Sequence, residues 1–512
     1  MRLGRARSVG LVGLQATLVD VEVSVGGGLP RTVIVGLPDA ALNEAKSRCR
    51  AAVASTGFGW PEHLVIINLS PASLPKAGTH FDLAIVGAVL AAKGSVPQAR
   101  LDDAVLMGEV GLDGGVRMAR GVLPAVLEAA RAGVGHAIVP MVQVREARLV
   151  QGIIVHGVAS VRDLAALLRG DEVAEYLPEV APIELGRREP DLADVAGQEE
   201  ARWAVEIAAA GAHHLFLKGP PGVGKTLLAE RLPGILPDLA PEEALEVAAI
   251  RSLAGLFVGG ELPLRPPYAA PHHSASLAAL AGGGSAIPQP GAISLAHRGV
   301  LFLDEVAEFA PKVIDALRTP LESGHIELAR ARAVTRYPSR FQLVLAANPC
   351  PCGYYGLAGR ECTCPPEAVR RYRERVSGPI LDRVDMQQTL MPMTQSHLRK
   401  AVRLTAESSE VVRARVAEAR ERQVQRLAPL GYRTNAEVPG PVLRQELPLP
   451  QGTQLIDQAV TRGLLSARGV DKVVRIAWTL ADLAGVGLPR RQDVQEALAM
   501  RRGEEVAEVR CG

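Results

Sequence analysis

Apolar and polar residues change their spacing along the first third of the chain. Strand-like runs alternate with segments of helical periodicity, the strands over residues 32–35, 64–68 and 136–139 and the helices over residues 81–93 and 123–132. Such alternation is typical of an α/β domain, which we expect over residues 1–170. Prolines and charges with weak periodicity follow over residues 171–190 and predict a linker.

The rest of the chain shows two further patterns. Apolar runs at residues 214–217, 299–303 and 341–347 predict buried strands of a second α/β domain over residues 191–390. From residue 391 to residue 512, amphipathic segments such as 401–426 and 454–483 predict a helical domain. We therefore expect a multidomain α/β protein with a helical C-terminal part.

An eight-residue motif follows the first strand of the second domain. Residues 219–226 match G-x-x-x-x-G-K-[ST], the nucleotide-binding P-loop. Its glycines let backbone N–H groups close around phosphates, and the following helix adds positive charge at its start. Lys225 can reach the β- and γ-phosphates, and Thr226 can offer its hydroxyl to Mg²⁺. The predicted nucleotide-binding residues are Gly219, Pro220, Pro221, Gly222, Val223, Gly224, Lys225 and Thr226.

The next two predicted strands end in polar residues. The first ends in Asp304, which can help to hold Mg²⁺, and Glu305, which can polarise the attacking water. The second ends at Asn348, whose amide can orient that water or contact the γ-phosphate. A P-loop, an acidic strand end and a polar strand end, in this order, resemble the AAA+ ATPases.

Nearly the whole chain resembles the magnesium-chelatase-like branch of these ATPases known as the ComM or YifB family. The motifs that carry the resemblance lie at residues 68–75, 194–198, 219–226, 271–276, 290–297, 348–353 and 377–383. The resemblance implies a parallel-sheet P-loop domain with a helical lid, and a homohexameric ring with ATP bound between subunits. For competence-associated members it implies a DNA motor that drives branch migration during recombination.

Two arginines outside the P-loop are further candidates. Arg383 lies where a neighbouring subunit's arginine would stabilise the γ-phosphate, an effect of about 10³–10⁵ in rate; the alternative is an ion pair with Asp382 or Asp385. The resemblance places Arg475 at the family's sensor-2 position, in contact with the phosphates of the same subunit. Arg468 could take that role instead.

The first domain resembles the proteolytic domain of the Lon protease at residues 75–80, 107–114 and 128–133. The resemblance implies a ribosomal S5 domain 2-like α/β fold. A Ser–Lys dyad needs a hydroxyl and a buried amine, but the aligned positions hold His80 and about Leu123. We therefore expect a scaffold for assembly or partner binding rather than a protease.

Four of the six cysteines lie within 15 residues. Cys350, Cys352, Cys362 and Cys364 can supply the four thiolates of a tetrahedral Zn²⁺ site. The spacing C-x-C is tighter than the usual C-x₂-C, so four reduced thiols without a metal remain the alternative.

Three segments are candidates for DNA contact. Residues 324–336 predict a β-hairpin, and Arg330 and Arg332 at its tip could grip phosphates. Residues 370–375 place a tyrosine among arginines, and residues 399–433 form a basic helix. His272 and His273 lie in a Pro/Gly-rich insertion, where a structural or substrate-gripping role is favoured over metal binding.

Composition and charge limit where nucleic acid could bind and where the protein is located. The chain of 512 residues has 48% hydrophobic residues and a formal net charge of +2, so a nucleic-acid surface must be a local patch. No apolar segment follows the basic residues near the start, and the apolar run at residues 83–92 is far short of the roughly 20 residues of a membrane span. We expect a cytoplasmic protein without a membrane segment.

Two functions stay open at this point. The first is an ATP-driven motor that acts on DNA as a helicase or branch-migration enzyme. The alternative is a chelatase-like protein-remodelling ATPase that does not act on DNA. The absent dyad argues against an ATP-dependent protease, and the set Asp304, Glu305 and Arg383 argues against a nucleotide switch that does not hydrolyse ATP.

Overall fold

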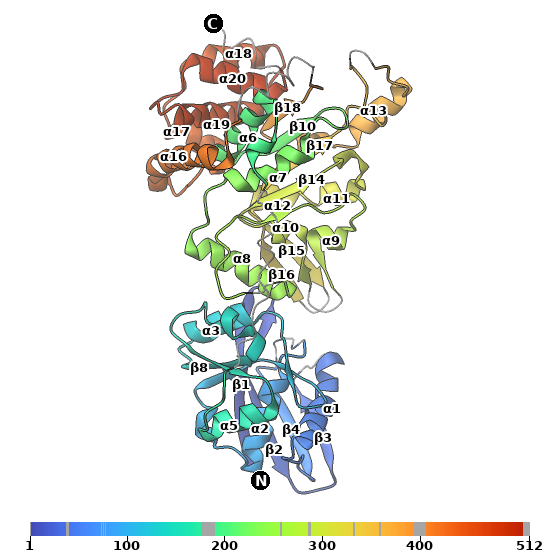
Figure 1. The fold of residues 1–512 in the computed structure, drawn as a ribbon, viewed down its shortest axis with the longest axis vertical. Helices are drawn as coiled ribbons and strands as arrows, with labels where there is room; N and C mark the ends of the chain where they lie inside the picture. The colour runs from blue at the N-terminus through green and yellow to red at the C-terminus, as the bar shows by residue number, and fades with distance from the viewer. Residues whose placement is uncertain are drawn as a thin grey trace.

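The computed structural model describes residues 2–36, 40–72, 74, 76, 78–175, 190–256, 259–284, 288–330, 333–357, 360–393 and 406–504. These residues form an N-terminal α/β block, a second α/β block above it, and C-terminal helices at the far end of the long axis (Figure 1). The multidomain α/β fold expected from the sequence is confirmed, with a parallel sheet and a helical C-terminal part.

The N-terminal block is built on a seven-stranded sheet in the order β3-β4-β2-β1-β5-β8-β9. All five elements that the sequence predicts for this block are present to within two residues. Its strands are β1 (Arg2–Val12), β2 (Gln15–Gly26), β3 (Arg31–Val35), β4 (Leu64–Ser70), β5 (Ala104–Leu106), β8 (His136–Pro140) and β9 (Ile154–Val158), with β6 (Glu109–Val110) and β7 (Val116–Arg117) as a separate hairpin. Its helices are α1 (Ala40–Ser55), α2 (Asp82–Lys93), α3 (Val122–Arg131), α4 (Val144–Ala147) and α5 (Val161–Arg169).

The long antiparallel hairpin β1–β2 is absent from the sequence prediction. Its outward side is charged, with Arg5 lying 3.3 Å from Glu22. On the inward side of β1, a Cβ at Gly4 would lie 2.1 Å from the carbonyl oxygen of Ala88, so only glycine lets α2 pack this closely. Small residues beneath a helix give β1 little apolar signal. In β2, buried Val19, Val21 and Val23 alternate with acidic residues, a strand pattern that the sequence prediction missed.

The second block holds a five-stranded parallel sheet in the order β11-β14-β17-β10-β18. The three predicted strands form its centre, and their carboxyl ends meet at one edge. The strands are β10 (Leu215–Lys218), β11 (Tyr268–Ala269), β14 (Val300–Leu303), β17 (Gln342–Ala347) and β18 (Met386–Thr389), with hairpins β12 (Gly282–Gly283)–β13 (Gln289–Pro290) and β15 (His325–Arg330)–β16 (Ala333–Pro338). The helices are α6 (Glu199–Gly211), α7 (Lys225–Ile235), α8 (Pro241–Ala254), α9 (Leu277–Ala281), α10 (Ala292–Leu295), α11 (Pro311–Asp315), α12 (Arg318–Ser323), α13 (Pro366–Glu374) and α14 (Gly378–Leu381).

The C-terminal block is helical, as the pattern predicts. The segment 454–483 is divided into two helices, because Gly463 takes a φ of +68° and Ser466 caps the helix that follows. Among the described residues, no helix combines the length and the apolar character needed to cross a membrane. The helices are α16 (Ser409–Leu427), α17 (Gly440–Gln445), α18 (Thr453–Thr461), α19 (Ala467–Leu483) and α20 (Arg491–Arg502).

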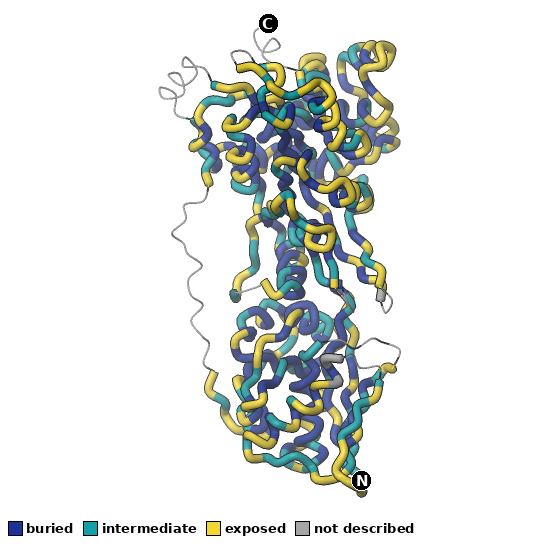
Figure 2. The backbone as a smooth tube through the Cα atoms, turned by 90° about the vertical axis from the view of Figure 1, so that its right-hand side faces the viewer, coloured by how far each residue is buried: buried dark blue, intermediate teal, exposed yellow. Residues whose placement is uncertain are grey.

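The two α/β blocks share buried contacts at their junction. The N–H groups of Gly121 and Leu123 donate to the carbonyl and hydroxyl oxygens of Ser252 on α8, at 3.1 and 3.3 Å. The β1–β2 turn also touches β16, where a Cβ at Gly13 would lie 2.5 Å from Cγ2 of Thr335. Buried backbone runs through the interior of both blocks (Figure 2).

A buried ion pair joins the C-terminal helices to the parallel sheet. Lys472 Nζ on α19 lies 2.7 Å from Asp385 Oδ1, and the two side chains are only 8% and 5% exposed. The N–H of His214 donates to the other carboxylate oxygen at 2.8 Å. Burial acts to raise the pKa of Asp385, but Lys472 and His214 outweigh it and hold that pKa below its ordinary value.

Lys472→Ala should lower the free energy of unfolding by about 3–5 kcal/mol, because it leaves the Asp385 carboxylate buried without its partner. The matched control is Arg444→Ala, which removes a half-exposed partner of Asp471 and should cost about 1 kcal/mol or less. Chemical denaturation followed by the fluorescence of Trp478, on the same helix as Lys472, measures both. Equal losses in the two variants would contradict the importance of the buried pair.

Candidate nucleotide-binding site

The P-loop lies between β10 and α7, at the carboxyl edge of the parallel sheet. Gly222 and Gly224 take φ angles of +81° and +94°, a region that glycine enters without steric cost. Lys225 is buried, and its Nζ donates to the carbonyl oxygens of Gly219 at 2.7 Å and Pro220 at 2.9 Å. The loop is closed around the ammonium group predicted to bind phosphates.

The polar ends of β14 and β17 meet this loop. Thr226 Oγ1 donates to Asp304 Oδ2 at 2.6 Å, so the two predicted Mg²⁺ ligands are in contact. Asn348 Oδ1 accepts from Lys225 Nζ at 2.9 Å. Burial lowers the pKa of Lys225, while Asp304 and Glu305 act to raise it. The structure thus brings together residues that the sequence places at three separate strand ends.

Glu305 has an unusual backbone and an unexpected neighbour. Its φ of +49° lies in the left-handed region, where a non-glycine residue is strained, and such strain is often found at functional sites. Its Oε2 lies 3.5 Å from Nδ1 of His273. The sequence favours a structural or substrate-gripping role for His273. Nothing in the local pattern connects this residue with Glu305. The contact places His273 beside the carboxylate predicted to activate water.

A cavity of about 690 Å³ adjoins the P-loop. Residues 194–196, 198, 392 and 393 form part of its wall, and Tyr354, Leu357 and Arg360 form another part. Gln198 Nε2 donates to the carbonyl oxygen of Met391 at 2.8 Å, which joins two chain segments at this wall. The volume lies in the range of small-molecule sites, and the position suits the nucleoside part of ATP.

A second cleft, of about 880 Å³, lies at the opposite edge of the same sheet. His214 and Gln342, at the amino ends of β10 and β17, line it together with Arg383, Arg468 and Arg475. Since the P-loop follows the carboxyl end of β10, the length of the sheet separates these arginines from the P-loop of their own subunit.

The placement of Arg475 corrects one expectation. Its Nε donates to the carbonyl oxygen of Val438 at 2.8 Å in the amino-edge cleft, and burial lowers its pKa. A contact of Arg475 with the phosphates of the same subunit is therefore wrong for this structure. Arg468 lies in the same cleft and does not take over that role. The reason is tertiary: the C-terminal helices pack beside the amino edge of the sheet.

Arg383 has an ion-pair partner that the sequence did not suggest. Its Nη2 lies 2.5 Å from Glu322 Oε1, and Arg468 Nη2 lies 3.5 Å from the same oxygen. Neither Asp382 nor Asp385, the partners considered from the sequence, is the residue bound most closely. The role of Arg383 towards a neighbouring subunit stays a prediction.

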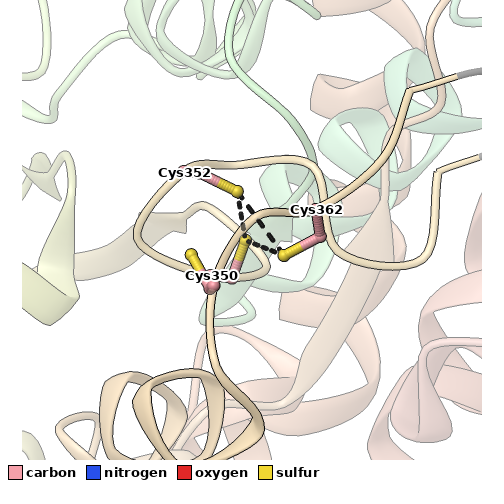
Figure 3. Close-up of side chains that lie close together, drawn as sticks. Cys350, Cys352 and Cys362 are labelled. Carbon is pink, nitrogen blue, oxygen red and sulfur yellow. Dashed lines mark hydrogen bonds between the residues drawn. The ribbon is translucent and has the colours of Figure 1, made fainter.

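The four cysteines after β17 converge on one point (Figure 3). The Sγ atoms of Cys350, Cys352 and Cys362 lie 3.3–3.6 Å apart, and all four, with Cys364, lie within 4.8 Å of one another. Tetrahedral Zn²⁺ with thiolate bonds of about 2.3 Å separates its sulfur ligands by about 3.8 Å. The donor set therefore fits Zn²⁺.

The three segments that the sequence suggests for DNA contact lie in different parts of the structure. The predicted hairpin is confirmed as β15–β16, with Arg330 exposed near its tip; Arg332 lies outside the described residues. Helix α13 extends to the side of the ATPase block (Figure 1), with Arg370 and Arg371 about three-quarters exposed. Residues 399–405 of the third candidate lie outside the described residues, and Arg415 of α16 is partly exposed and already paired with Glu206 at 2.8 Å and Glu407 at 2.7 Å.

The positions of the absent protease dyad are used for packing. His80 is buried, with Nε2 2.9 Å from the carbonyl oxygen of Val9, and Leu123 is buried at the junction of the two blocks. Near them, Asp82 is buried in a bidentate pair with Arg48 at 2.9 and 3.1 Å. Both aligned positions thus hold buried side chains, and the scaffold role of the block stays a prediction.

Comparison with known proteins covers most of the chain. The family described as magnesium chelatase, subunit ChlI matches residues 191–398, that described as subunit ChlI of Mg-chelatase matches residues 21–143, and the C-terminal family of the same subunit matches residues 406–501. The protein YifB of Escherichia coli is 41% identical over 98% of this chain and 97% of its own length, and the competence protein ComM of Haemophilus influenzae is 38% identical over 98% of each. Lon protease 2 of Bacillus subtilis is 33% identical over 27% of this chain and 26% of its own length.

Lys225→Ala should abolish tight ATP binding, because it removes the ammonium group at the centre of the P-loop. Glu305→Gln should still bind ATP but hydrolyse it at least about 10²-fold more slowly, because an amide cannot act as the base. Binding of a fluorescent ATP analogue and phosphate release measure the two effects. Glu308→Gln, which alters a carboxylate paired with Arg375 at 3.2 Å, is the control and should leave both unchanged. Normal turnover by Glu305→Gln would rule out its proposed role.

Proposed function

Because the chain belongs to the ComM and YifB family of magnesium-chelatase-like AAA+ ATPases, we propose that it is a ring-forming motor that acts on DNA. ATP hydrolysis with Mg²⁺ at the P-loop would drive helicase or branch-migration activity in recombination or natural transformation. The relative from Haemophilus influenzae is a competence protein, which supports a role in the handling of incoming DNA.

The observation that carries the proposal is the cationic hairpin β15–β16. It lies in the chain between the strand that ends in Asp304 and the strand that ends in Asn348. Ile326 and Tyr337 anchor its base in the core, and the Tyr337 hydroxyl donates to the carbonyl oxygen of Pro288 at 2.7 Å. Arg330 remains exposed at the other end. A hairpin rooted between two catalytic strands can pass nucleotide-driven movement to DNA phosphates.

The two clefts support a homohexamer. The nucleotide cavity lies at one edge of the sheet and the cleft with Arg383 and Arg475 at the other. Head-to-tail packing places unlike surfaces together, and it forms a ring when the rotation between successive subunits closes. Such packing would bring Arg383 and Arg475 of one subunit towards the γ-phosphate bound by the next, where their charges stabilise phosphoryl transfer.

A protein-remodelling ATPase is the second candidate. It is supported by the three chelatase-subunit families that match this chain. The two candidates differ in one measurable property, since only the DNA motor should hydrolyse ATP faster when single-stranded, double-stranded or branched DNA is added.

The proposal includes a structural Zn²⁺ at Cys350, Cys352, Cys362 and Cys364. Four convergent thiols fit the ligand number of a closed tetrahedral site. The metal would take no part in hydrolysis, which needs only Mg²⁺ at Thr226 and Asp304.

Mixing Arg383→Ala protein with Glu305→Gln protein should restore some ATP hydrolysis if Arg383 acts on the neighbouring subunit. About a quarter of the head-to-tail interfaces then combine an intact Glu305 with an intact Arg383. Phosphate release is measured under conditions where subunits exchange. The control replaces the first partner with the double variant Arg383→Ala, Glu305→Gln, which cannot restore activity. A mixture as inactive as its components would contradict the action between subunits.

Arg330→Ala with Arg332→Ala should weaken DNA binding and DNA-stimulated hydrolysis, while basal hydrolysis stays nearly unchanged. Each lost phosphate contact should also reduce the slope of log affinity against log salt by about 0.7–0.9. Titrations with labelled DNA at several salt concentrations test this. Arg370→Ala with Arg371→Ala on α13 is the comparison. If the hairpin variant keeps its affinity and slope while the α13 variant loses them, α13 is the DNA surface; if both keep them, the remodelling function is favoured.

A further inference from the structure

The four-cysteine loop begins beside the catalytic strand end. Cys350 follows Asn348 by two residues, and Asn348 Oδ1 accepts from Lys225 Nζ at 2.9 Å. The first thiol and the amide that contacts the P-loop lysine therefore belong to one short segment. A metal ion bound by this thiol would restrain the segment that carries Asn348.

The same loop packs directly on the P-loop. Gly353 takes a φ of +84°, and a Cβ at this position would lie 2.4 Å from Cδ of Pro221. Only a residue without a side chain allows this approach. The segment between the two cysteine pairs thus packs against the ring of Pro221 in the P-loop.

Residues between the cysteine pairs form a wall of the nucleotide cavity. Tyr354, Leu357 and Arg360 line the cavity of about 690 Å³ beside the P-loop. The guanidinium carbon of Arg360 lies 3.7 Å from the centroid of the Tyr354 ring. An aromatic ring with a stacked cation offers a flat surface and positive charge, which suit a purine ring and a phosphate respectively.

The contacts that position this wall pass through the cysteines. The N–H of Tyr355 donates to Cys350 Sγ at 3.4 Å, and Arg373 of α13 stacks on the Tyr355 ring at 4.7 Å. Hydrogen bonds of the thiol groups link the two C-x-C pairs. Thiols are weak hydrogen-bond partners, whereas thiolate bonds to Zn²⁺ contribute directly to the free energy of folding.

We propose that Zn²⁺ bound by the four cysteines fixes Tyr354, Leu357 and Arg360 as a wall of the nucleotide site, and that metal loading thereby sets the affinity for ATP. This inference rests on the nucleotide site and the zinc site of the proposed function, but it does not depend on DNA. Metal-free protein keeps the contacts of Lys225 with the carbonyl oxygens of Gly219 and Pro220 but loses the wall, so it binds ATP weakly.

The test compares three full-length proteins: the wild type, Cys362→Ser with Cys364→Ser, and the control Cys49→Ala, which removes a buried thiol from the N-terminal block. Metal content is measured by mass spectrometry, and the Kd of a fluorescent ATP analogue is measured with Mg²⁺ and without DNA. The wild type and the control should carry about one zinc ion per chain and share one Kd. The double variant should lose the metal and bind about tenfold or more weakly, a loss of about 1.4 kcal/mol.

A second variant distinguishes loss of the cavity wall from loss of the metal and of the folded structure. Tyr354→Ala with Arg360→Ala should keep the zinc ion and the unfolding temperature of the wild type, yet bind the analogue about tenfold more weakly. Wild-type protein without metal, or a metal-free cysteine variant with unchanged Kd, would overturn the inference. Failure of the DNA motor is distinguishable, because DNA would then fail to stimulate hydrolysis while the metal-dependent Kd persists.

Discussion

The contacts of the Lys225 ammonium group hold the nucleotide site together. Its three acceptors, the carbonyl oxygens of Gly219 and Pro220 and the amide oxygen of Asn348, lie at 2.7–2.9 Å. Asn348 ends β17 and the P-loop follows β10, and these strands are neighbours in register. Strand pairing therefore determines where the ammonium group sits. Entering phosphates would compete with these carbonyl oxygens for an amine that is already positioned.

The parallel sheet holds two sets of groups at opposite edges. One set would bind the phosphates, and the other contains the arginines that would act on the next subunit. Phosphate-binding groups lie at the carboxyl edge, because that is where backbone N–H groups and strand-end carboxylates meet. The arginines Arg383 and Arg475 lie at the amino edge, between the sheet and the C-terminal helices. One subunit cannot bring its own two edges together. In the proposed ring, this separation makes hydrolysis depend on assembly.

Helix α8 connects the catalytic sheet with the N-terminal block. Glu246 on α8 lies 3.0 Å from His297 and 3.1 Å from Arg298, just before the strand that leads to Asp304. Six residues further along the helix, Ser252 binds the start of α3. The N-terminal block can thus serve the ATPase mechanically, since it contacts helix α8, which pairs with the residues just before β14, and also contacts the hairpin β15–β16.

The sequence by itself determined the P-loop, Asp304, Glu305, Asn348 and the cysteine cluster. These positions belong to contiguous motifs at strand ends, and a parallel sheet necessarily gathers such ends at one edge. Only the tertiary structure decided that Arg475 lies at the other edge, that His273 reaches Glu305, and that the cysteine loop borders the nucleotide cavity. Amphipathic periodicity shows that a helix packs on something but not on which edge of a sheet it packs. Contacts between distant segments depend on that choice, so local patterns do not encode them.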